Sequence, residues 1–259
     1  MSKTTKMNSI ASVAVAALLL SINAASGAQT SSGSGPNSVY IEQVGDSNTI
    51  TIEQVGGNNN IGGTNGTAWS MPSSSNYGTI TGTSNVVSMT QTGSGNTGQY
   101  TMYGNNNFYT SIVTGAGNKT KLTIGDIGTP SNLRNHVTET ITGDTNIVMT
   151  NVKGNDINST LVSTGDSNQV TSDLLSSSGR SDINISGNNN LMKVQQTDSA
   201  GSGGHVLTAT VTGDYNSIVS QQQGFNDTNV YINTIGSYNM VTVRTSSGTI
   251  VGPLSATPR

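Results

Sequence analysis

A short phrase recurs along the chain about every eleven residues: a glycine, two small or polar residues, and then an asparagine. Examples are Gly45-Asp46-Ser47-Asn48 and Gly165-Asp166-Ser167-Asn168. A fixed short period means that one structural unit is stacked on copies of itself. Two units make roughly 22 residues, the length of a strand-turn-strand-turn coil with two flat sides. The repeat therefore constrains the fold more than any local motif does.

Apolar and polar residues alternate between these turns. Counted from Asn48 as zero, the even places of residues 49–54 hold Ile, Ile and Gln, and the odd places hold Thr, Thr and Glu. Alternation with period two, bounded by glycine and asparagine, is typical of a half-buried strand whose even places face inward. Some units keep the spacing without the asparagine, which gives about 18 strands or about nine coils. The sequence predicts an all-β, two-sheet β-solenoid over residues 37–247.

The period breaks in three places, which predict insertions at corners of the solenoid. About four extra residues separate Asn59 from Ser74, in a stretch that contains the single tryptophan, Trp69. About six separate Asn118 from Asn135, and about four separate Asn190 from His205.

The corner residues have two expected roles. Glycine reaches positive φ without a steric cost, and asparagine tolerates it better than most residues. An inward asparagine also lies above its copy in the next coil, so that its amide can donate to one neighbour and accept from the other, and inward glutamines can do the same. The alternative is that the asparagines only form turns. The expected ladder residues are Asn37, Gln43, Asn48, Gln54, Asn85, Gln91, Asn96, Asn107, Asn118, Asn135, Asn146, Asn168, Asn190, Gln196, Asn216, Gln222 and Asn239. The expected corner glycines are Gly45, Gly82, Gly93, Gly104, Gly115, Gly143, Gly165, Gly187, Gly213 and Gly236.

The first residues are typical of a secretion signal. Lys3 and Lys6 precede an apolar run over residues 10–22, and small residues around Ala28 suit cleavage by a signal peptidase. We expect a signal peptide at 1–28, a flexible segment at 29–36 and a C-terminal tail at 248–259. The run is too short to span a bilayer, so we expect an exported protein without membrane insertion. The chain has no cysteine, so no disulfide staples it.

Composition argues against several classes of function. Removal of Lys3 and Lys6 with the signal leaves 8 basic and 13 acidic residues, a balance that repels nucleic acid. The acidic residues fall about one per unit, mostly in turns, so no pair of carboxylates for catalysis is apparent. His136 and His205 have no third ligand nearby in the pattern, and we predict no enzyme activity, no cofactor and no metal site. Glu139 falls at an even, inward place, which we interpret as a local shift of register.

One segment carries a family motif. Asn37-x5-Gln43-x4-Asn48-x5-Gln54 resembles the curlin repeat, Ser-x5-Gln-x4-Asn-x5-Gln, with asparagine in the serine place. Full motifs occur only near the N-terminal end, because later units hold residues such as Met102 or Val211 in the glutamine place. The resemblance implies an exported bacterial subunit of an extracellular amyloid fibre of a biofilm matrix. It also implies passage through an outer-membrane pore and templating by a nucleator subunit.

Physical reasoning also favours a polymer. A stack of strands ends in two open edges, so we expect end-to-end stacking of copies of this chain into a homopolymer. Corner aspartates are expected to slow this assembly. The alternative is a monomeric secreted solenoid that acts as an adhesin or binds ice through outward threonines. The threonine pattern argues against ice binding, because the matching places also hold Lys121, Met149, Asp173 and Lys193.

Overall fold

The computed structural model describes residues 37–62, 78–125, 133–175, 177–197, 204–224 and 226–246. The predicted signal peptide at 1–28, the segments at 29–36 and 248–259, and Trp69 lie outside the described residues. The described part contains 19 strands in two sheets, every pair of strands is parallel, and no helix occurs in it.

The two sheets take alternate strands of the chain. Sheet A contains β1 (Ser38–Val39), β2 (Ile41–Val44), β4 (Asn60–Gly62), β5 (Gly78–Thr81), β7 (Thr97–Tyr103), β9 (Lys119–Ile124), β11 (Ile147–Val152), β13 (Gln169–Leu175), β15 (Leu191–Thr197), β17 (Ser217–Gln223) and β19 (Met240–Ser246). Sheet B contains β3 (Thr49–Val55), β6 (Val86–Ser94), β8 (Phe108–Ala116), β10 (His136–Thr142), β12 (Asn158–Thr164), β14 (Arg180–Ser186), β16 (Val206–Thr212) and β18 (Asn229–Ile235).

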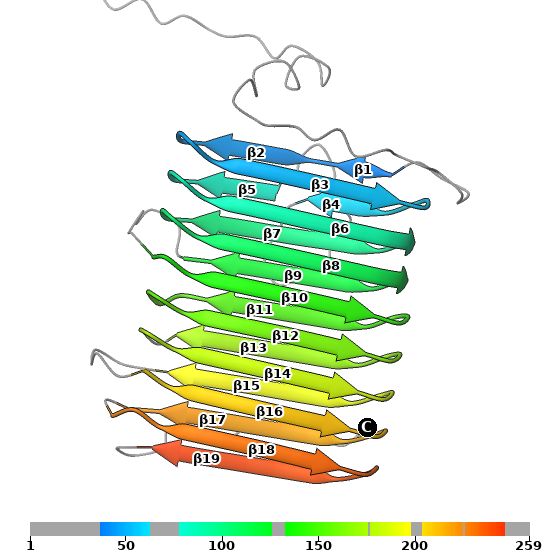
Figure 1. Cartoon of the computed structure of the whole chain (residues 1–259), viewed down its shortest axis with the longest axis vertical. Coiled ribbons are helices and arrows are strands. Elements are labelled where there is room, and N and C mark those ends of the chain that lie inside the picture. Colours follow the sequence, from blue (N-terminus) through cyan, green and yellow to red (C-terminus); the bar gives the residue numbers. More distant parts are fainter. Residues whose placement is uncertain are drawn as a thin grey trace, which may run out of the picture.

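The chain winds from one sheet to the other and rises by one strand per turn, as the colours of Figure 1 show from β1 to β19. The prediction of a two-sheet β-solenoid is therefore confirmed. In sheet A, β4 and β5 share one level, because both pair with β7. Strands β1 and β2 share the level before it, because β1 pairs with β4 and β2 pairs with β5. The stack thus has nine levels in sheet A and eight in sheet B, which is eight complete turns and one further strand.

The first insertion differs from the prediction. Residues 60–62 pair with residues 97–99, and residues 79–81 pair with residues 101–103 on the same strand, β7. Residues 60–62 and 78–81 therefore occupy a single strand level, on either side of residues 63–77. The spacing between Asn59 and Asn85 permits either two units with four extra residues or one unit with fifteen extra residues. The fold has one unit with fifteen extra residues. The other two insertions follow β9 and β15, at the corner where the chain passes from sheet A to sheet B.

The core fills the space between the two sheets with the even-place side chains. Typical inward residues are Leu122 and Val148 from sheet A and Val137 and Ile183 from sheet B, and all of these are buried. The largest are Tyr100 and Tyr109, which are fully buried. Tyr100 fits because its neighbour in the stack is Gly78, where a Cβ atom would lie 2.5 Å from the tyrosine ring. The even-odd pattern of the sequence thus sets which side of each strand is buried.

Candidate functional site

The predicted asparagines, together with Asn59, which was not among the expected ladder residues, form two separate columns, one at each corner of the solenoid. Column one precedes every level of sheet A and is uninterrupted over nine levels. Its members are Asn37, Asn59, Asn96, Asn118, Asn146, Asn168, Asn190, Asn216 and Asn239. Column two precedes sheet B and contains Asn48, Asn85, Asn107 and Asn135.

Asn146 illustrates the hydrogen bonds of column one. Its Nδ2 donates to the backbone oxygen of Gly165 in the next coil at 2.8 Å and to Oδ1 of Asn118 in the preceding coil at 3.1 Å. Its Oδ1 accepts the backbone N–H of Asn168 at 2.9 Å. The amide therefore bonds to both adjacent coils, and it satisfies backbone groups that would cost about 1–3 kcal/mol each if they were buried without partners.

The column asparagines do not supply the unusual backbone angles of the corner. In the phrase Gly165-Asp166-Ser167-Asn168, Gly165 has φ 108° and Ser167 has φ 58°. Across the described residues no member of either column has positive φ, and the left-handed residue is the one just before it. The expectation that these asparagines are chosen for their tolerance of positive φ is therefore wrong. Their hydrogen bonds along the stack give the physical reason for asparagine at this place.

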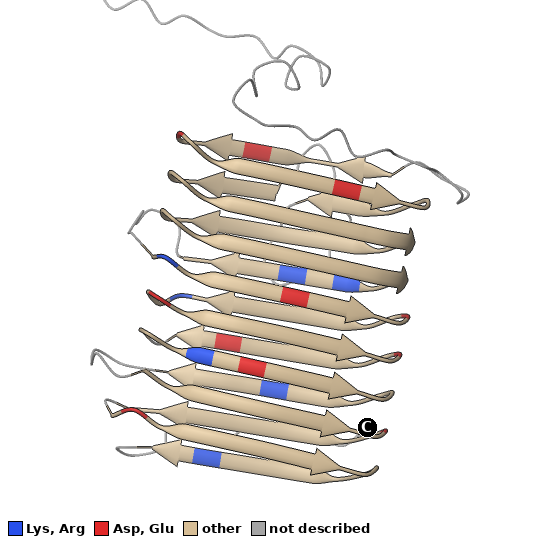
Figure 2. Cartoon of the chain, in the orientation of Figure 1, with Lys and Arg blue, Asp and Glu red and all other residues tan. Residues whose placement is uncertain are grey.

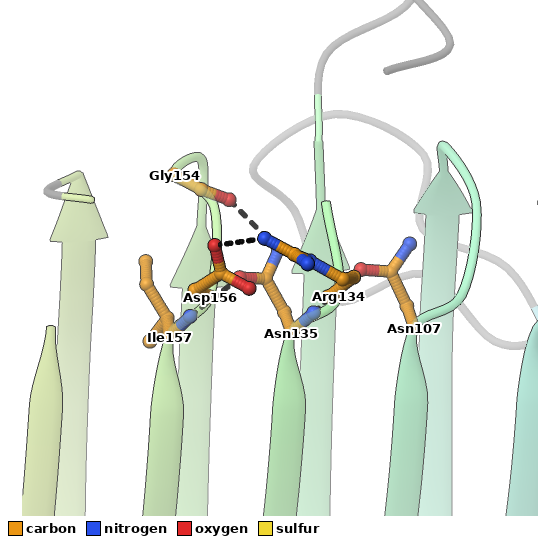
Figure 3. A network of polar contacts seen from close by, with 6 residues as sticks. All are labelled: Asn107, Arg134, Asn135, Gly154, Asp156 and Ile157. Carbon is orange, nitrogen blue, oxygen red and sulfur yellow. Dashed lines mark hydrogen bonds and ion pairs between the residues drawn. The ribbon is translucent and has the colours of Figure 1, made fainter. Parts of the chain in front are cut away.

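Column two ends partway along the stack (Figure 3). Asn135 still makes the hydrogen bonds that are typical of a column asparagine. Its Oδ1 accepts the backbone N–H of Ile157 at 2.9 Å, and its Nδ2 donates to the oxygen of Gly154 at 2.8 Å. Ile157 then occupies the asparagine place, buried and without an amide to extend the column. Beside this point Arg134 and Asp156 form an exposed ion pair at 2.7 Å, a kind that adds little stability.

The glutamines do not form one column. Gln54 and Gln91 lie in sheet B, where Nε2 of Gln54 donates to Oε1 of Gln91 at 3.0 Å. Gln196 and Gln222 lie in sheet A and form a second pair at 3.1 Å. Gln43 also belongs to sheet A, but its neighbour there is Ile80. The expected glutamine ladder therefore consists of two short pairs, and Gln43 belongs to neither.

The corner glycines are required by close contact between coils. All ten predicted corner glycines have positive φ. At Gly165, a Cβ atom would lie 2.2 Å from the backbone oxygen of Gly187 in the next coil, so no other residue fits. Gly56 was not among the predicted corner glycines, yet it has φ 106°, and a Cβ atom there would lie 1.8 Å from the oxygen of Gly93. Its signal was present in the sequence as Gly56-Gly57-Asn58-Asn59.

Three of the four corner aspartates expected to slow assembly, Asp144, Asp166 and Asp214, form a second, exposed ladder beside column one, whereas the fourth, Asp46, lies at the corner of column two. Oδ1 of Asp144 accepts the backbone N–H of Ala116 at 2.7 Å, and Oδ1 of Asp166 accepts the N–H of Asp144 at 2.7 Å. Asn188 and Asp214 continue the same pattern. These carboxylates therefore accept backbone N–H groups at the corner of the preceding coil. They also place like charges in adjacent or nearly adjacent coils.

Glu139 is a buried carboxyl within the core. Tyr109 donates its hydroxyl to Oε2 at 2.8 Å, and Thr150 donates to Oε1 at 2.7 Å. Glu139 pairs in register with Ser111 and Leu161, so the expected shift of register does not occur. Burial raises the pKa of the Glu139 carboxyl to about 7, although the two hydrogen bonds oppose this change. Burial, and the nearby carboxyl of Glu139, also raise the pKa of Tyr109.

The two histidines stay apart. His136 lies exposed at the start of β10, whereas His205 occupies the asparagine place of column two and is buried. There Nδ1 of His205 lies 2.8 Å from Oγ1 of Thr228. Within the described ranges, no group of three His, Cys, Asp or Glu side chains is arranged to hold a metal ion. The described residues also contain no helix that is long and apolar enough to cross a membrane.

Both ends of the stack expose strand edges and apolar side chains. The last pairs in the sheets are β17 with β19 and β16 with β18, and no described strand lies beyond β19 or β18. This end carries Tyr231, Ile235, Tyr238 and Met240, which are exposed by 59 to 78%. The rings of Tyr238 and Tyr215 stack with centroids 5.1 Å apart. Tyr231 and Ile235 are outward residues of β18 in sheet B, whereas Met240 is an outward residue of β19 in sheet A.

Comparison with known proteins gives one match. Residues 36–62 match the family described as the curlin associated repeat. No curated protein and no solved structure matches the chain. The matched residues cover β1 to β4, which is the first coil and the start of the second. The same two-strand coil then continues in register to β19. A curlin associated repeat thus occupies the first coil of the solenoid and the start of the second.

Proposed function

We propose that the protein is the structural subunit of an extracellular bacterial amyloid-like fibre that serves a biofilm matrix or adhesion. In this proposal, copies stack end to end, with the C-terminal end of one solenoid against the N-terminal end of the next. The fibre is a homopolymer, and the chain has no enzymatic role. The curlin repeat supports this general class, and the form of assembly rests on the ends of the stack.

The observation that carries the proposal is the continuity of column one from end to end. At every step of the column, Oδ1 of one asparagine accepts the backbone N–H of the next, and at six of the eight steps it also accepts from Nδ2 of the next. Among the described residues, Oδ1 of Asn239 accepts no hydrogen bond, and the backbone N–H of Asn37 donates none. The C-terminal end thus presents an acceptor and the N-terminal end presents donors, so that a second copy in the same orientation would extend the column.

The strand edges have the same polarity. The backbone N–H of Ser217 donates to the oxygen of Asn239 at 2.8 Å, so the outward residues of each strand bond toward the following coil. In β19 the outward residues Met240, Thr242 and Arg244 point their backbone groups at the open edge. An open parallel edge is a template for a further strand, and a contact between unlike ends produces a filament.

Export, the pore and the nucleator belong to the proposal through the resemblance at the N-terminal coil. The predicted signal at 1–28 would direct the chain out of the cell. A nucleator subunit would supply the first open edge, and later copies would add to it.

The test is growth of fibres from the chain without residues 1–28, diluted from denaturant and followed by electron microscopy. We expect unbranched fibrils in the wild type. Thr242→Pro should form a folded monomer that does not elongate from its C-terminal end, because proline removes an N–H that faces only the open edge. Thr242→Val is the matched control and should grow normally. A soluble, β-rich wild-type monomer that never polymerises would overturn the proposal in favour of a monomeric adhesin or ice-binding protein.

A further inference from the structure

The structure separates the outward side chains onto two faces of very different character. The residues that interrupt the threonine pattern, Lys121, Met149, Asp173 and Lys193, lie on β9, β11, β13 and β15. All four strands belong to sheet A. The outer face of sheet B therefore lacks these interruptions, which the sequence alone could not show.

We name the outward residues of β6, β8, β10, β12, β14 and β16 the threonine face. Before the corner that ends each strand, they are Val86, Ser88, Thr90, Thr92, Phe108, Thr110, Ile112, Thr114, His136, Thr138, Thr140, Thr142, Asn158, Thr160, Val162, Thr164, Arg180, Asp182, Asn184, Ser186, Val206, Thr208, Thr210 and Thr212. Twelve of these twenty-four residues are threonine, and the fourth outward place of every strand carries a hydroxyl in register over six coils. Such a face is flat and repeats in two directions.

The threonine face is nearly free of charge. Strands β6, β8, β12 and β16 carry no charged residue, as Figure 2 shows. Its two charged members lie on β14, where Asp182 accepts a hydrogen bond from Nε of Arg180 at 2.6 Å and the two charges compensate each other. Sheet A, in contrast, carries Lys119, Lys121 and Lys193 at outward places.

The threonine face is also open. Every one of its outward side chains is half-buried or exposed, whereas outward Gln99 and Val219 of sheet A are buried. The insertions at 63–77, 126–132 and 198–203 interrupt sheet A or follow one of its strands. The strands of sheet B have no break within them.

We propose that the threonine face binds the same face of a second copy, so that two fibres pair side by side. This inference rests on the proposed function, because the partner is a neighbouring fibre. Identical faces that carry like charges repel each other, and the threonine face avoids this cost. Two copies of sheet A would bring Lys119, Lys121 and Lys193 against the same residues of the partner.

The size and stiffness of the face suit this contact. Six strands about 4.8 Å apart and about 23 Å long give roughly 650 Å² per copy, or roughly 1,300 Å² for both, which is within the range of stable interfaces. Threonine, valine and isoleucine have restricted χ1 angles, so little side-chain freedom is lost on contact. Packed β-branched side chains from facing sheets are the arrangement of a steric zipper.

The experiment compares fibres of Thr140→Lys with fibres of Thr123→Lys. Thr140 lies in the middle of the threonine face between Ile112 and Val162, and Thr123 is a half-buried outward residue of sheet A between Thr101 and Asn151. We expect wild-type and Thr123→Lys fibres to pair in electron micrographs, and the paired fraction to fall at least tenfold in Thr140→Lys without a change in elongation rate. Equal pairing in both variants would overturn the inference, whereas the absence of any fibre from the wild type would overturn the proposed function instead.

A second measurement covers the case in which Thr140→Lys does not assemble. The chain has no cysteine, so Thr140→Cys and Thr123→Cys each introduce a single thiol. In fibres, reaction of the thiol at position 140 with a maleimide should slow at least tenfold relative to the monomer, and position 123 should change little. Equal reactivity at both positions would refute the face-to-face contact. Thermal hysteresis of the monomer with unpaired fibres would identify ice as the occupant of the face and would also refute it.

Discussion

Replacement of the buried carboxyl Glu139→Gln should change how stability depends on pH. The folded state raises the pKa of Glu139 from 4.5 to about 7, so folding favours the protonated form. Its contribution to stability is therefore complete below about pH 4.5 and is lost as the pH rises through about 7. At about 1.4 kcal/mol per pKa unit, the loss amounts to about 3 kcal/mol. Glutamine cannot ionise, and it can both accept from and donate to the hydroxyls of Tyr109 and Thr150.

The assay is urea unfolding of the monomer, followed by far-UV circular dichroism at low protein concentration between pH 4 and pH 8. The difference in unfolding free energy, Glu139→Gln minus wild type, should increase by about 3 kcal/mol as the pH rises from 4 to 8. Other titrating groups are common to both proteins and cancel in the comparison. Glu53→Gln, on the outward side of β3, is the matched control and should follow the wild type. A difference between Glu139→Gln and wild type that stays constant with pH would refute the reasoning.

Three further changes test the corners. Asn146→Ala removes the hydrogen bonds to Gly165 and Asn168 and should cost roughly 2–5 kcal/mol of unfolding free energy in urea, and a loss below 1 kcal/mol would contradict the ladder. Gly165→Ala should cost at least about 3 kcal/mol in the same assay, whereas Gly95→Ala, whose added Cβ atom would lie 4.0 Å from its nearest neighbour, should cost about 1 kcal/mol. Replacement of the corner aspartates by asparagine should shorten the lag of fibre growth, measured by dye fluorescence, because asparagine removes the repulsion between coils and keeps the acceptor oxygen. An unchanged lag would show that the aspartates do not slow assembly. The aspartates to replace together are Asp144, Asp166 and Asp214.

The sequence was sufficient to predict the period, the inward places and the two sheets. These follow from local rules, because a strand exposes alternate side chains to opposite faces and a glycine is needed wherever two coils approach closely. The expected corner glycines all have positive φ for this reason.

The details that the sequence could not predict depend on neighbours in space. The spacing from Asn59 to Asn85 fits two arrangements, and only the pairing of β4 and β5 with β7 distinguishes them. Glu139 on β10 and its two partners, Tyr109 on β8 and Thr150 on β11, come from three different coils of the sequence pattern. The division of outward residues into a charged face and a threonine face likewise appears only when alternate units are assigned to separate sheets.

The most direct test of end-to-end stacking is the mass per length of single fibres, measured by scanning transmission electron microscopy. Nine levels in sheet A, at about 4.8 Å each, predict one subunit per roughly 43 Å of fibre. Side-by-side pairing of two fibres would double the mass per length and leave the axial repeat unchanged. A mass per length about nine times larger, equivalent to one subunit per strand spacing, would mean that each chain forms a single layer, and it would contradict the stacked solenoid.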